Sequence, residues 1–412
     1  MKILGKKISL KKIIAIFFCI IFLGFGTYGL FFLYRFNRPI IINDFHDPFI
    51  FNNSTRVETQ EDWKLRRNEI REILLDIEYG TMPNHPYNIT GQVIDTMDLG
   101  DGNILNTIKL IMYPKESSTK PINLTLWVYI PNGTGPFPTI IKVAKDGTGS
   151  QEKISEYLLE RGYMYVCYNH TELDPDTKGY DIDGPCQQAF SNYSWGSLAV
   201  WAWGAMRVAD YLLNESWVSA SEGIPNIDPD FLIITGHSRR GKTALLAGAL
   251  DERFTMVVPN GSGCGGAGSF LVQGFLAEIV SDITSRSTFR SWFKDGFENY
   301  GGNEHLLPFD QHFLRALVAP RVILSTDAKM DLWANPIGTQ AVYEATLPVY
   351  EFLNATTNNT IHYRSGGHAF TKEDFIVLLD VSDKLLLGKE VIGNFYMTPY
   401  NIDFPIYYSA PN

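Results

Sequence analysis

The stretch FLIITGHSRRGKTALLAGAL, residues 231–250, constrains the fold of this chain more than any other part of its sequence. It opens with an apolar, β-branched run, breaks at Gly236, presents Ser238 and resumes after Gly241 as an Ala- and Leu-rich helix. A strand, a sharp turn and a helix in this order are typical of a nucleophile elbow, which exposes a serine above a sheet, with its Oγ near the positive end of the following helix. The usual form is G-x-S-x-G, whereas here two arginines separate the serine from the second glycine. A chance Gly-x-Ser at the end of a strand is the alternative interpretation.

Apolar strands and helices alternate on both sides of this elbow. Strands are predicted over residues 138–144, 163–168, 254–259, 322–326 and 360–363, and helices over 152–161, 197–213, 271–283, 339–353 and 372–386. A helix over 61–79 and two antiparallel edge strands over 105–113 and 122–130 precede them. The alternation predicts an α/β protein with a mostly parallel central sheet covered on both faces, a three-layer αβα sandwich. An elbow in the middle of such a sheet predicts the α/β-hydrolase fold.

The composition narrows the possible functions. The chain has 412 residues, of which 45% are hydrophobic, so it is expected to fold rather than to stay disordered. Its net charge of -10 argues against a nucleic-acid partner. Outside the N-terminal apolar run the cysteines are Cys167, Cys186 and Cys264, and no pair of them has C-x-x-C spacing. Structural zinc is therefore not expected, and at most one disulfide can form among these three.

The N-terminal region predicts a membrane anchor. Residues 13–34 carry no charge and, as a helix, are long enough to cross a hydrocarbon core of about 30 Å. A cleaved signal peptide is the alternative, but it usually has a shorter apolar region and a small-x-small cleavage site. Five lysines precede the run and two arginines follow it, which places residues 1–12 in the cytoplasm as a basic tail. We interpret 13–34 as a transmembrane signal anchor, 35–60 as a tether, and 61–412 as a domain on the extracellular or lumenal side.

Asparagine-linked glycosylation sequons support this orientation. They occur at Asn52, Asn53, Asn88, Asn123, Asn132, Asn169, Asn192, Asn214, Asn260, Asn354 and Asn358. Chance would give roughly three in a chain of this composition. The excess indicates a glycosylated ectodomain. Asn260 is expected to stay unmodified because it lies beside the presumed active centre, whereas acceptor sites need an exposed loop.

A serine nucleophile needs a base, and the base needs an acid that fixes its tautomer. In the α/β-hydrolase fold these residues follow the serine in the order acid, then histidine. The candidates for the base are His305, His312, His362 and His368. His368 lies in a Gly-rich loop between the last strand and the last helix, where a base should stand over the sheet edge, and is the predicted general base. His362 falls within a strand and His312 begins an apolar helix, so both are interpreted as structural.

Asp331 is the predicted acid of the triad. It lies in the loop after strand 322–326, which faces the histidine loop in this fold. Asp327 is the other candidate for the acid, and its alternative interpretation is a residue that caps the loop.

Several motifs together resemble carbohydrate esterase family 15, the glucuronoyl esterases. The resemblance extends from about Glu69 to the last helix. It is carried by GHSRRGK at 236–242, DERF at 251–254, NGSGCGG at 260–266, LPFDQH at 307–312, APR at 319–321, DLWANP at 331–336 and GH at 367–368. It implies hydrolysis of the ester between 4-O-methylglucuronic acid on xylan and a lignin alcohol, without metal or cofactor.

The resemblance also implies roles for individual residues. Ser238 would be the nucleophile, His368 the general base, and Arg239 would stabilise the oxyanion through its backbone N–H and its guanidinium. The loss of one oxyanion donor typically costs about 10²–10³ in rate. In many members the acid is a glutamate after the strand ending near residue 259, where this chain has Gly261. Other members place it in the Asp-x-Trp loop, which here supplies Asp331.

Three further residues are implied to bind the sugar. Lys242 matches a lysine that donates to sugar hydroxyls, and Trp333 matches a tryptophan that lines the uronate site. Glu278 matches a sugar-contacting glutamate, although two extra residues before Trp292 weaken that alignment. A charge on a helix face and core packing are the alternative interpretations of Lys242 and Trp333.

The sequence therefore predicts a serine esterase that acts on a polysaccharide or uronic-acid ester and is expected to be a monomer. One alternative is a carbohydrate esterase that removes acetyl groups, such as an acetyl xylan esterase. Another is a catalytically silent, membrane-tethered binding ectodomain.

Overall fold

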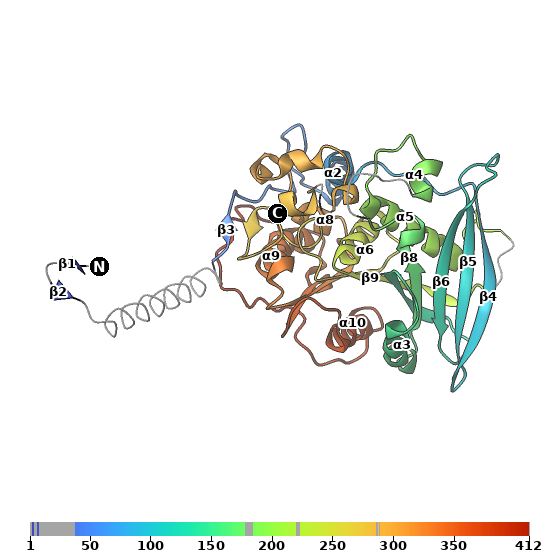
Figure 1. Ribbon diagram of the computed structural model, residues 1–412. Helices are drawn as coiled ribbons and strands as arrows, with labels where there is room; N and C mark the ends of the chain where they lie inside the picture. The colour runs from blue at the N-terminus through green and yellow to red at the C-terminus, as the bar shows by residue number, and fades with distance from the viewer. Residues whose placement is uncertain are drawn as a thin grey trace.

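The computed structural model describes residues 38–177, 184–219, 223–285, 287 and 289–411, together with 2–3 and 6–7. Its centre is a nine-stranded sheet (Figure 1). In chain order the strands are β4 (Asn88–Gly100), β5 (Asn103–Tyr113), β6 (Ile122–Ile130), β7 (Phe137–Ala144), β8 (Met164–Asn169), β9 (Ile227–His237), β10 (Met256–Asn260), β12 (Val322–Ala328) and β13 (Asn359–Arg364). Two short strands, β1 (Lys2–Ile3) and β2 (Lys6–Lys7), form a separate antiparallel pair.

The sheet is parallel over most of its width. Its order is β13-β12-β10-β9-β7-β8-β6-β5-β4. All pairs from β13 to β8 are parallel, and β6, β5 and β4 continue the sheet as an antiparallel extension. The predicted mostly parallel sheet is therefore confirmed. The long strand β4 is an addition to the prediction, because the segment lacks a continuous apolar run.

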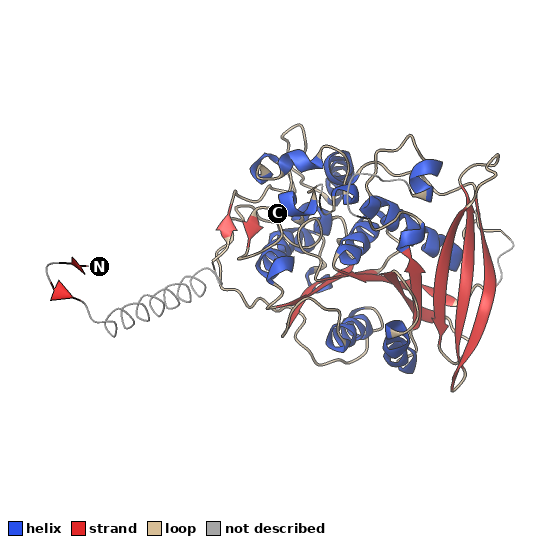
Figure 2. Ribbon diagram, in the orientation of Figure 1, coloured by secondary structure: helices blue, strands red, loops and turns tan. Residues whose placement is uncertain are grey.

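Helices cover both faces of the sheet, which gives the predicted three layers. Figure 1 shows α3 and α10 below the sheet, and Figure 2 shows the larger group of helices above it. The helices are α2 (Gln60–Leu74), continued by a π-helical turn (Leu75–Tyr79), α3 (Ser150–Glu160), α4 (Pro185–Ala189), α5 (Ser197–Leu212), α6 (Arg239–Leu250), α7 (Val280–Ile283), α8 (His312–Ala316), α9 (Pro336–Phe352) and α10 (Lys372–Leu385). Single 3-10 turns occur at His170–Glu172, Arg290–Trp292, Phe297–Tyr300, Glu304–Leu306, Leu332–Ala334 and Thr356–Asn358.

Two apolar cores separate these layers. Because side chains alternate across a strand, consecutive residues of β9 enter different cores: Ile233 packs with α3 and α10, and Ile234 packs with α5 and α6. Both side chains are fully buried. Burial of an isoleucine side chain stabilises the fold by about 1.5–3 kcal/mol. The strand that carries the elbow is thus anchored on both faces.

The predicted helix over 271–283 is wrong. The segment forms a short strand, β11 (Val272–Gln273), an irregular stretch and the single-turn helix α7. Ser269 Oγ accepts hydrogen bonds from the backbone N–H groups of residues 271 and 272, and β11 pairs with β3 (Ile40–Ile41). Asn335 Oδ1 accepts from the N–H of Gly274 at 3.0 Å. Oδ2 of Asp310 also accepts from the N–H of Leu271. These contacts with Asp310, Asn335 and β3 bind backbone groups that a helix would need at its start.

The predicted tether, residues 35–60, is partly packed onto the domain. Phe45, Phe49 and Val57 are buried, and Phe49 belongs to the main core. These apolar side chains explain the difference, because a free tether would leave them in water. The predicted membrane span, residues 13–34, lies outside the described residues. Among the helices that are described, none combines the length and the apolar character that crossing a membrane requires.

Candidate active site

Ser238 occupies a strained turn between β9 and α6. Its φ is 59° and its ψ is -128°, a conformation that residues other than glycine rarely adopt and that is expected of a nucleophile elbow. Its backbone N–H donates to the carbonyl of Asn260 at 2.9 Å. A Cβ at Gly236 would lie 2.2 Å from the carbonyl oxygen of Arg240, and one at Gly241 would lie 2.9 Å from that of Asn260. Both glycines are thus required by close backbone approach, although their spacing departs from G-x-S-x-G.

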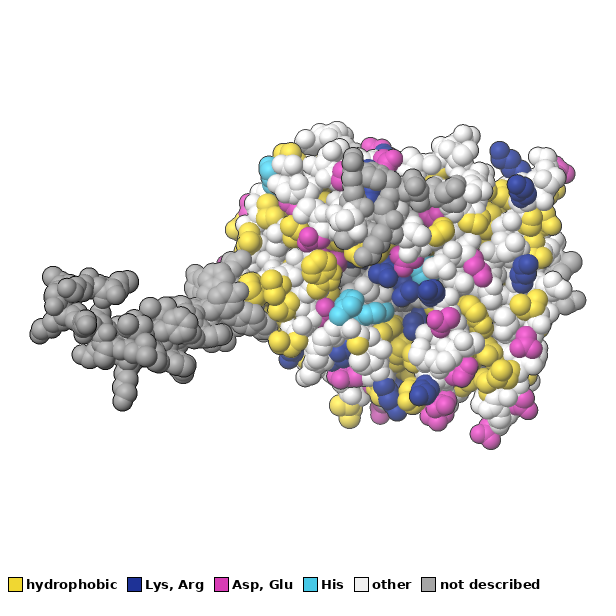
Figure 3. Space-filling model, viewed as in Figure 1, with side chains coloured by type: hydrophobic (Ala, Val, Ile, Leu, Met, Phe, Trp, Pro, Cys, Tyr) yellow, Lys and Arg dark blue, Asp and Glu magenta, His cyan; other side chains and the backbone are white. Residues whose placement is uncertain are grey.

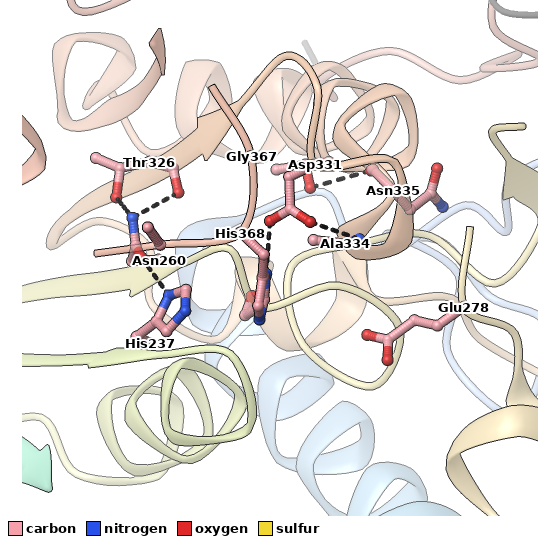
Figure 4. Close-up of polar contacts among 12 residues, drawn as sticks. His237, Asn260, Glu278, Thr326, Asp331, Ala334, Asn335, Gly367 and His368 are labelled. Carbon is pink, nitrogen blue, oxygen red and sulfur yellow. Dashed lines mark hydrogen bonds and ion pairs between the residues drawn. The ribbon is translucent and has the colours of Figure 1, made fainter. Parts of the chain in front are cut away.

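His368 and Asp331 form the predicted base–acid pair. Nδ1 of His368 lies 2.7 Å from Oδ2 of Asp331, as Figure 4 shows. Asp331 is buried in the loop after β12, and the His368 side chain is 38% exposed in the loop after β13. Because a carboxylate only accepts hydrogen bonds, Nδ1 carries the proton and Nε2 is left as the basic nitrogen of the neutral ring. This is the tautomer that a general base for a serine requires.

The two positions that the resemblance implies for the acid converge in space. A Cβ built on Gly261 would lie 3.3 Å from Oδ2 of Asp331. A longer side chain at position 261 would therefore compete with Asp331 for the same place. The rival Asp327 is buried in β12, where burial and then the charge of Asp331 raise its pKa well above its usual range. The histidine is paired with Asp331.

A second histidine, His237, lies beside the base and was missed by the sequence prediction. The rings of His237 and His368 are 4.4 Å apart. Nδ1 of His237 lies 2.6 Å from Oδ1 of Asn260, whose Nδ2 donates to Thr326 (Figure 4). Since the amide nitrogen is used as a donor, Oδ1 is the acceptor, and Nδ1 of His237 carries the proton. Burial and then His368 lower the pKa of His237 to about 4, so the base has a neutral neighbour at neutral pH.

Arg239 follows the serine, and its guanidinium is held by a carboxylate at Nε and by two aromatic rings. Its Nε donates to Oδ2 of Asp176 at 2.7 Å. Its guanidinium lies over the rings of Trp292 and Phe289, at 5.4 and 5.8 Å from their centroids, and these two rings stack at 3.9 Å. No described residue forms a hydrogen bond with either Nη group of Arg239. The arginine is thus oriented with its two Nη groups available for a ligand.

Asp176 is ionised across the pH range of most assays. Burial raises its pKa, but His170 and Arg239 outweigh burial and hold the pKa at about 2. Nδ1 of the buried His170 donates to the carbonyl of Ala144, and its Nε2 lies 4.0 Å from Oδ2 of Asp176. No sequence pattern indicates Asp176, because it lies in an irregular loop 63 residues before Arg239.

The three residues expected at the sugar lie together, but Lys242 is not free. Its Nζ is buried and donates three hydrogen bonds. The acceptors are Oε1 of Glu278 and the carbonyl of Ser262, each at 2.6 Å, and the carbonyl of Cys264. All three ammonium hydrogens are used, so a sugar hydroxyl would reach Lys242 only by displacing one of these acceptors. The structure thus places Lys242 where it orients Glu278 and the 262–264 loop.

Glu278 and Trp333 are joined through the backbone. The N–H of Glu278 donates to the carbonyl of Trp333 at 2.9 Å. Burial, against the opposing effect of Lys242, raises the pKa of Glu278. Figure 4 shows the Glu278 carboxylate on the opposite side of His368 from His237. Trp333 is 48% exposed, which suits a residue that lines a ligand site.

The part of the chain that the structure describes holds no group of His, Cys, Asp and Glu side chains suited to a metal ion. Cys167, Cys186 and Cys264 are buried free thiols.

A strained serine at an elbow, a His–Asp pair and an arginine beside the serine define a serine hydrolase with the α/β-hydrolase fold. Comparison with known proteins gives the family. Residues 115–354, more than half of the chain, match the family model for fungal glucuronyl esterases. The chain therefore belongs to the glucuronoyl esterase family, and the predicted resemblance and enzyme class are confirmed.

Individual relatives agree with this assignment. A 4-O-methyl-glucuronoyl methylesterase of Podospora anserina is 30% identical over 330 residues, which cover 77% of this chain and 62% of the relative. One of Hypocrea jecorina is 30% identical over 353 residues, 84% of this chain and 70% of the relative. A carbohydrate esterase family 15 glucuronoyl esterase of Caldicellulosiruptor kristjansonii superposes with a TM-score of 0.74 at 29% identity, covering 90% of this chain and 98% of that structure.

Proposed function

We propose that this protein hydrolyses glucuronoyl esters, in which the carboxyl group of a 4-O-methylglucuronate-type sugar is linked to an alcohol. The observation that carries the proposal is the His368–Asp331 pair in a chain whose Ser238 is held in the strained elbow. Membership of the glucuronoyl esterase family supports the substrate class.

The mechanism follows from the protonation states at the site. Ser238 Oγ attacks the ester carbonyl while Nε2 of His368 accepts its proton, and Asp331 stabilises the resulting imidazolium. The Nη groups and the backbone N–H of Arg239 donate to the oxyanion of the tetrahedral intermediate. His368 then returns the proton to the departing alcohol, which leaves an acyl-enzyme. A water molecule, deprotonated by the same histidine, hydrolyses it and releases the uronate.

The sugar would bind on the side of Trp333 and Glu278. An exposed indole offers a flat apolar surface for a pyranose ring, and the buried carboxylate beside it accepts hydrogen bonds from hydroxyl groups. The acyl part of an acetyl ester is a methyl group with no ring to contact these residues, so deacetylation is the less favoured alternative. A silent binding ectodomain would not require a strained serine, whose conformation costs free energy.

The proposal is tested on the full chain in mild detergent, with benzyl glucuronate and acetylated xylan as substrates. We expect release of benzyl alcohol, little release of acetate, and loss of both in Ser238→Ala. Ser117→Ala, in the exposed loop between β5 and β6, is the matched control and should behave like the wild type. Turnover of acetylated xylan alone would favour the deacetylase, and turnover of neither would favour the binding ectodomain.

We also propose that residues 13–34 anchor the enzyme in a membrane, with the esterase domain on the extracellular or lumenal side. The uncharged run and the lysines before it support this topology. Several sequons are exposed, as glycosylation requires: Asn52, Asn53, Asn123, Asn132, Asn192, Asn214 and Asn354. Resistance to alkaline extraction from membranes, and a shift in mobility on removal of N-glycans, are the expected results. Release by alkali would contradict the anchor.

A further inference from the structure

Arg240 is a cation beside the nucleophile that the described protein leaves unpaired. It is the second residue of α6, its side chain is half-buried, and its Nε is buried without an acceptor. It forms no hydrogen bond or ion pair with any residue that the structure describes. A guanidinium is charged at every accessible pH and carries five donors, so partial burial without an acceptor costs free energy. Such a cost is usual where a ligand supplies the missing partner.

The surroundings of Arg240 increase this cost. The first turn of α6 holds two arginines and no acidic residue, although the positive end of a helix favours acidic ones. Burial and then the charge of Arg239 lower the pKa of Arg240. Asp146 and Asp176 act in the other direction, but Oδ2 of Asp176 already accepts from Arg239, and neither carboxylate forms an ion pair with Arg240. Arg239 is thus neutralised and Arg240 is not.

The excess of positive charge is local. The chain as a whole has a net charge of -10. Figure 3 nevertheless shows dark blue Lys and Arg side chains gathered beside a cyan patch of histidine on one face. Arg239 and Arg240 are consecutive at this elbow, and of the two only Arg239 has a carboxylate partner among the described residues. An anion that approaches Ser238 would meet this charge.

The position of Arg240 indicates which part of an ester it would contact. Arg240 lies close enough to Lys142 on β7, Tyr168 on β8 and His170 in the turn after β8 for its positive charge to act on all three. The sheet order places β7 and β8 on one side of β9, and β10 and β12 on the other. Glu278 and Trp333 lie with the loops of β10 and β12. An ester bound at Ser238 with its sugar on their side would extend its alcohol toward β7, β8 and Arg240.

We propose that Arg240 is a specificity-determining residue that binds a carboxylate on the alcohol part of the ester substrate. The inference rests on the proposed function. The carboxyl group of the sugar is uncharged while it is esterified, so the anion must come from elsewhere in the substrate. A planar carboxylate matches the two parallel donors of a guanidinium, which explains an arginine at this position.

The test compares two esters of glucuronic acid that differ by one group, the benzyl ester and the 4-carboxybenzyl ester. The full chain in mild detergent is assayed with each, and the ratio of the two kcat/KM values is measured. We expect the wild type to prefer the carboxybenzyl ester by roughly five- to tenfold, the range of a partly screened charge-assisted pair. In Arg240→Met the ratio should fall to about one. In the wild type it should decrease with added salt.

Matched variants separate Arg240 from general electrostatics. Lys145→Met removes an exposed cation from the loop after β7 and should keep the wild-type ratio, whereas Asp146→Asn removes a nearby negative charge and should raise it. Labelling of Ser238 by a fluorophosphonate counts intact active sites in each variant, so a folding defect is recognised. The ratio is independent of that count.

Each remaining outcome overturns one proposal or both. A wild type that hydrolyses the benzyl ester but shows no preference, or an Arg240→Met variant that keeps the preference, overturns the role of Arg240 alone. Weaker product inhibition by glucuronate in Arg240→Met, with an unchanged ratio, would move the contact to the sugar carboxylate and also overturn it. If the wild type hydrolyses neither ester, the proposed function fails and the role of Arg240 fails with it.

Discussion

Nδ1 of His368 lies 2.7 Å from Oδ2 of Asp331, although 37 residues separate them in the chain. Two neighbouring parallel strands, β12 and β13, bring their loops to the same edge of the sheet and create this contact. The same carboxylate would be 3.3 Å from a Cβ at Gly261, in the loop after β10. Loops from two different strands can therefore deliver an acid to one place beside the histidine.

Asp331→Asn should inactivate the enzyme without unfolding it. An amide at this position can donate to Nδ1 and so stabilise the wrong tautomer of His368. We expect kcat on benzyl glucuronate to fall by about 10²–10⁴, with KM changed little. Steady-state kinetics and the thermal unfolding midpoint check this prediction. A variant with wild-type kcat would show that Asp331 is not the acid of the triad.

The acid should also be transferable to the other loop. Asp331→Ala combined with Gly261→Glu places a carboxylate on the neighbouring loop within reach of the same space. The φ of Gly261 is 48°, so glutamate there costs about 1–2 kcal/mol of stability. We expect the double variant to be at least tenfold more active than Asp331→Ala alone, with Gly261→Gln as the matched control. Equal activity of the glutamate and glutamine variants would contradict convergence of the two positions.

Asp176→Asn should reduce catalysis through Arg239. Without the carboxylate, the Nε contact weakens and the guanidinium no longer presents its Nη groups to the oxyanion in one orientation. We expect kcat to fall by about 10- to 100-fold with a smaller change in KM, a fraction of the loss for a deleted oxyanion donor. The fluorophosphonate labelling rate of Ser238 should fall in parallel, because it does not depend on the sugar.

A double-mutant cycle distinguishes this role from a structural one. If Asp176 acts through Arg239, the variant Asp176→Asn/Arg239→Ala is no slower than Arg239→Ala. Asp380→Asn is the control, since it breaks the partly exposed Arg161–Asp380 pair of α3 and α10 at 2.8 Å. Multiplicative losses in the double variant would show that the two residues act independently.

Those parts of the site that follow from chain order were predictable, and those that depend on lateral contacts were not. The elbow at Ser238 and the contact of His368 with Asp331 could be predicted because a nucleophile elbow fixes the chain order of the acid and the base that follow it. The contact of His237 with Asn260 arises because β9 and β10 pair in a register that places these two residues opposite each other. No periodicity along the chain reports the register between two parallel strands.

The failure at 271–283 has a similar origin. The apolar spacing there is compatible with a helix, but Asp310, Asn335 and strand β3 bind its backbone groups. Side-chain acceptors that come from another loop compete with helix formation, and a single sequence window does not contain them. Lys242 illustrates the same limit, since its place on α6 was clear but its three acceptors were not.

The stability of the protein should fall in mild acid because of His237. Its pKa is about 4 in the folded state, whereas an unfolded histidine titrates near 6.5. Between these values the unfolded chain binds a proton that the folded chain does not, so stability rises with pH across this window and is lost as the pH falls from about 6.5 to about 4. The loss is on the order of 3 kcal/mol.

Chemical denaturation of wild type and His237→Gln between pH 7 and pH 4 measures the contribution of His237 to this loss of stability. We expect the free energy of unfolding to fall more steeply with acid in the wild type than in the variant. His305→Gln is the control, because His305 is exposed. Equal slopes in wild type and His237→Gln would contradict the lowered pKa.

Trp333→Ala should affect uronate esters and spare simple ones. The indole is exposed on the turn that Asp331 begins, and its carbonyl accepts from the N–H of Glu278, so it lies beside the acid without contributing to the proton relay. We expect KM for benzyl glucuronate to rise by roughly tenfold, as for the loss of one aromatic contact, while hydrolysis of phenyl acetate stays within about twofold. Trp333→Phe should recover most of the loss, and Tyr407→Ala, at another exposed aromatic residue, should change neither substrate. An equal loss on both esters would instead place Trp333 in the support of the Asp331 loop, and the sugar site would have to be sought elsewhere.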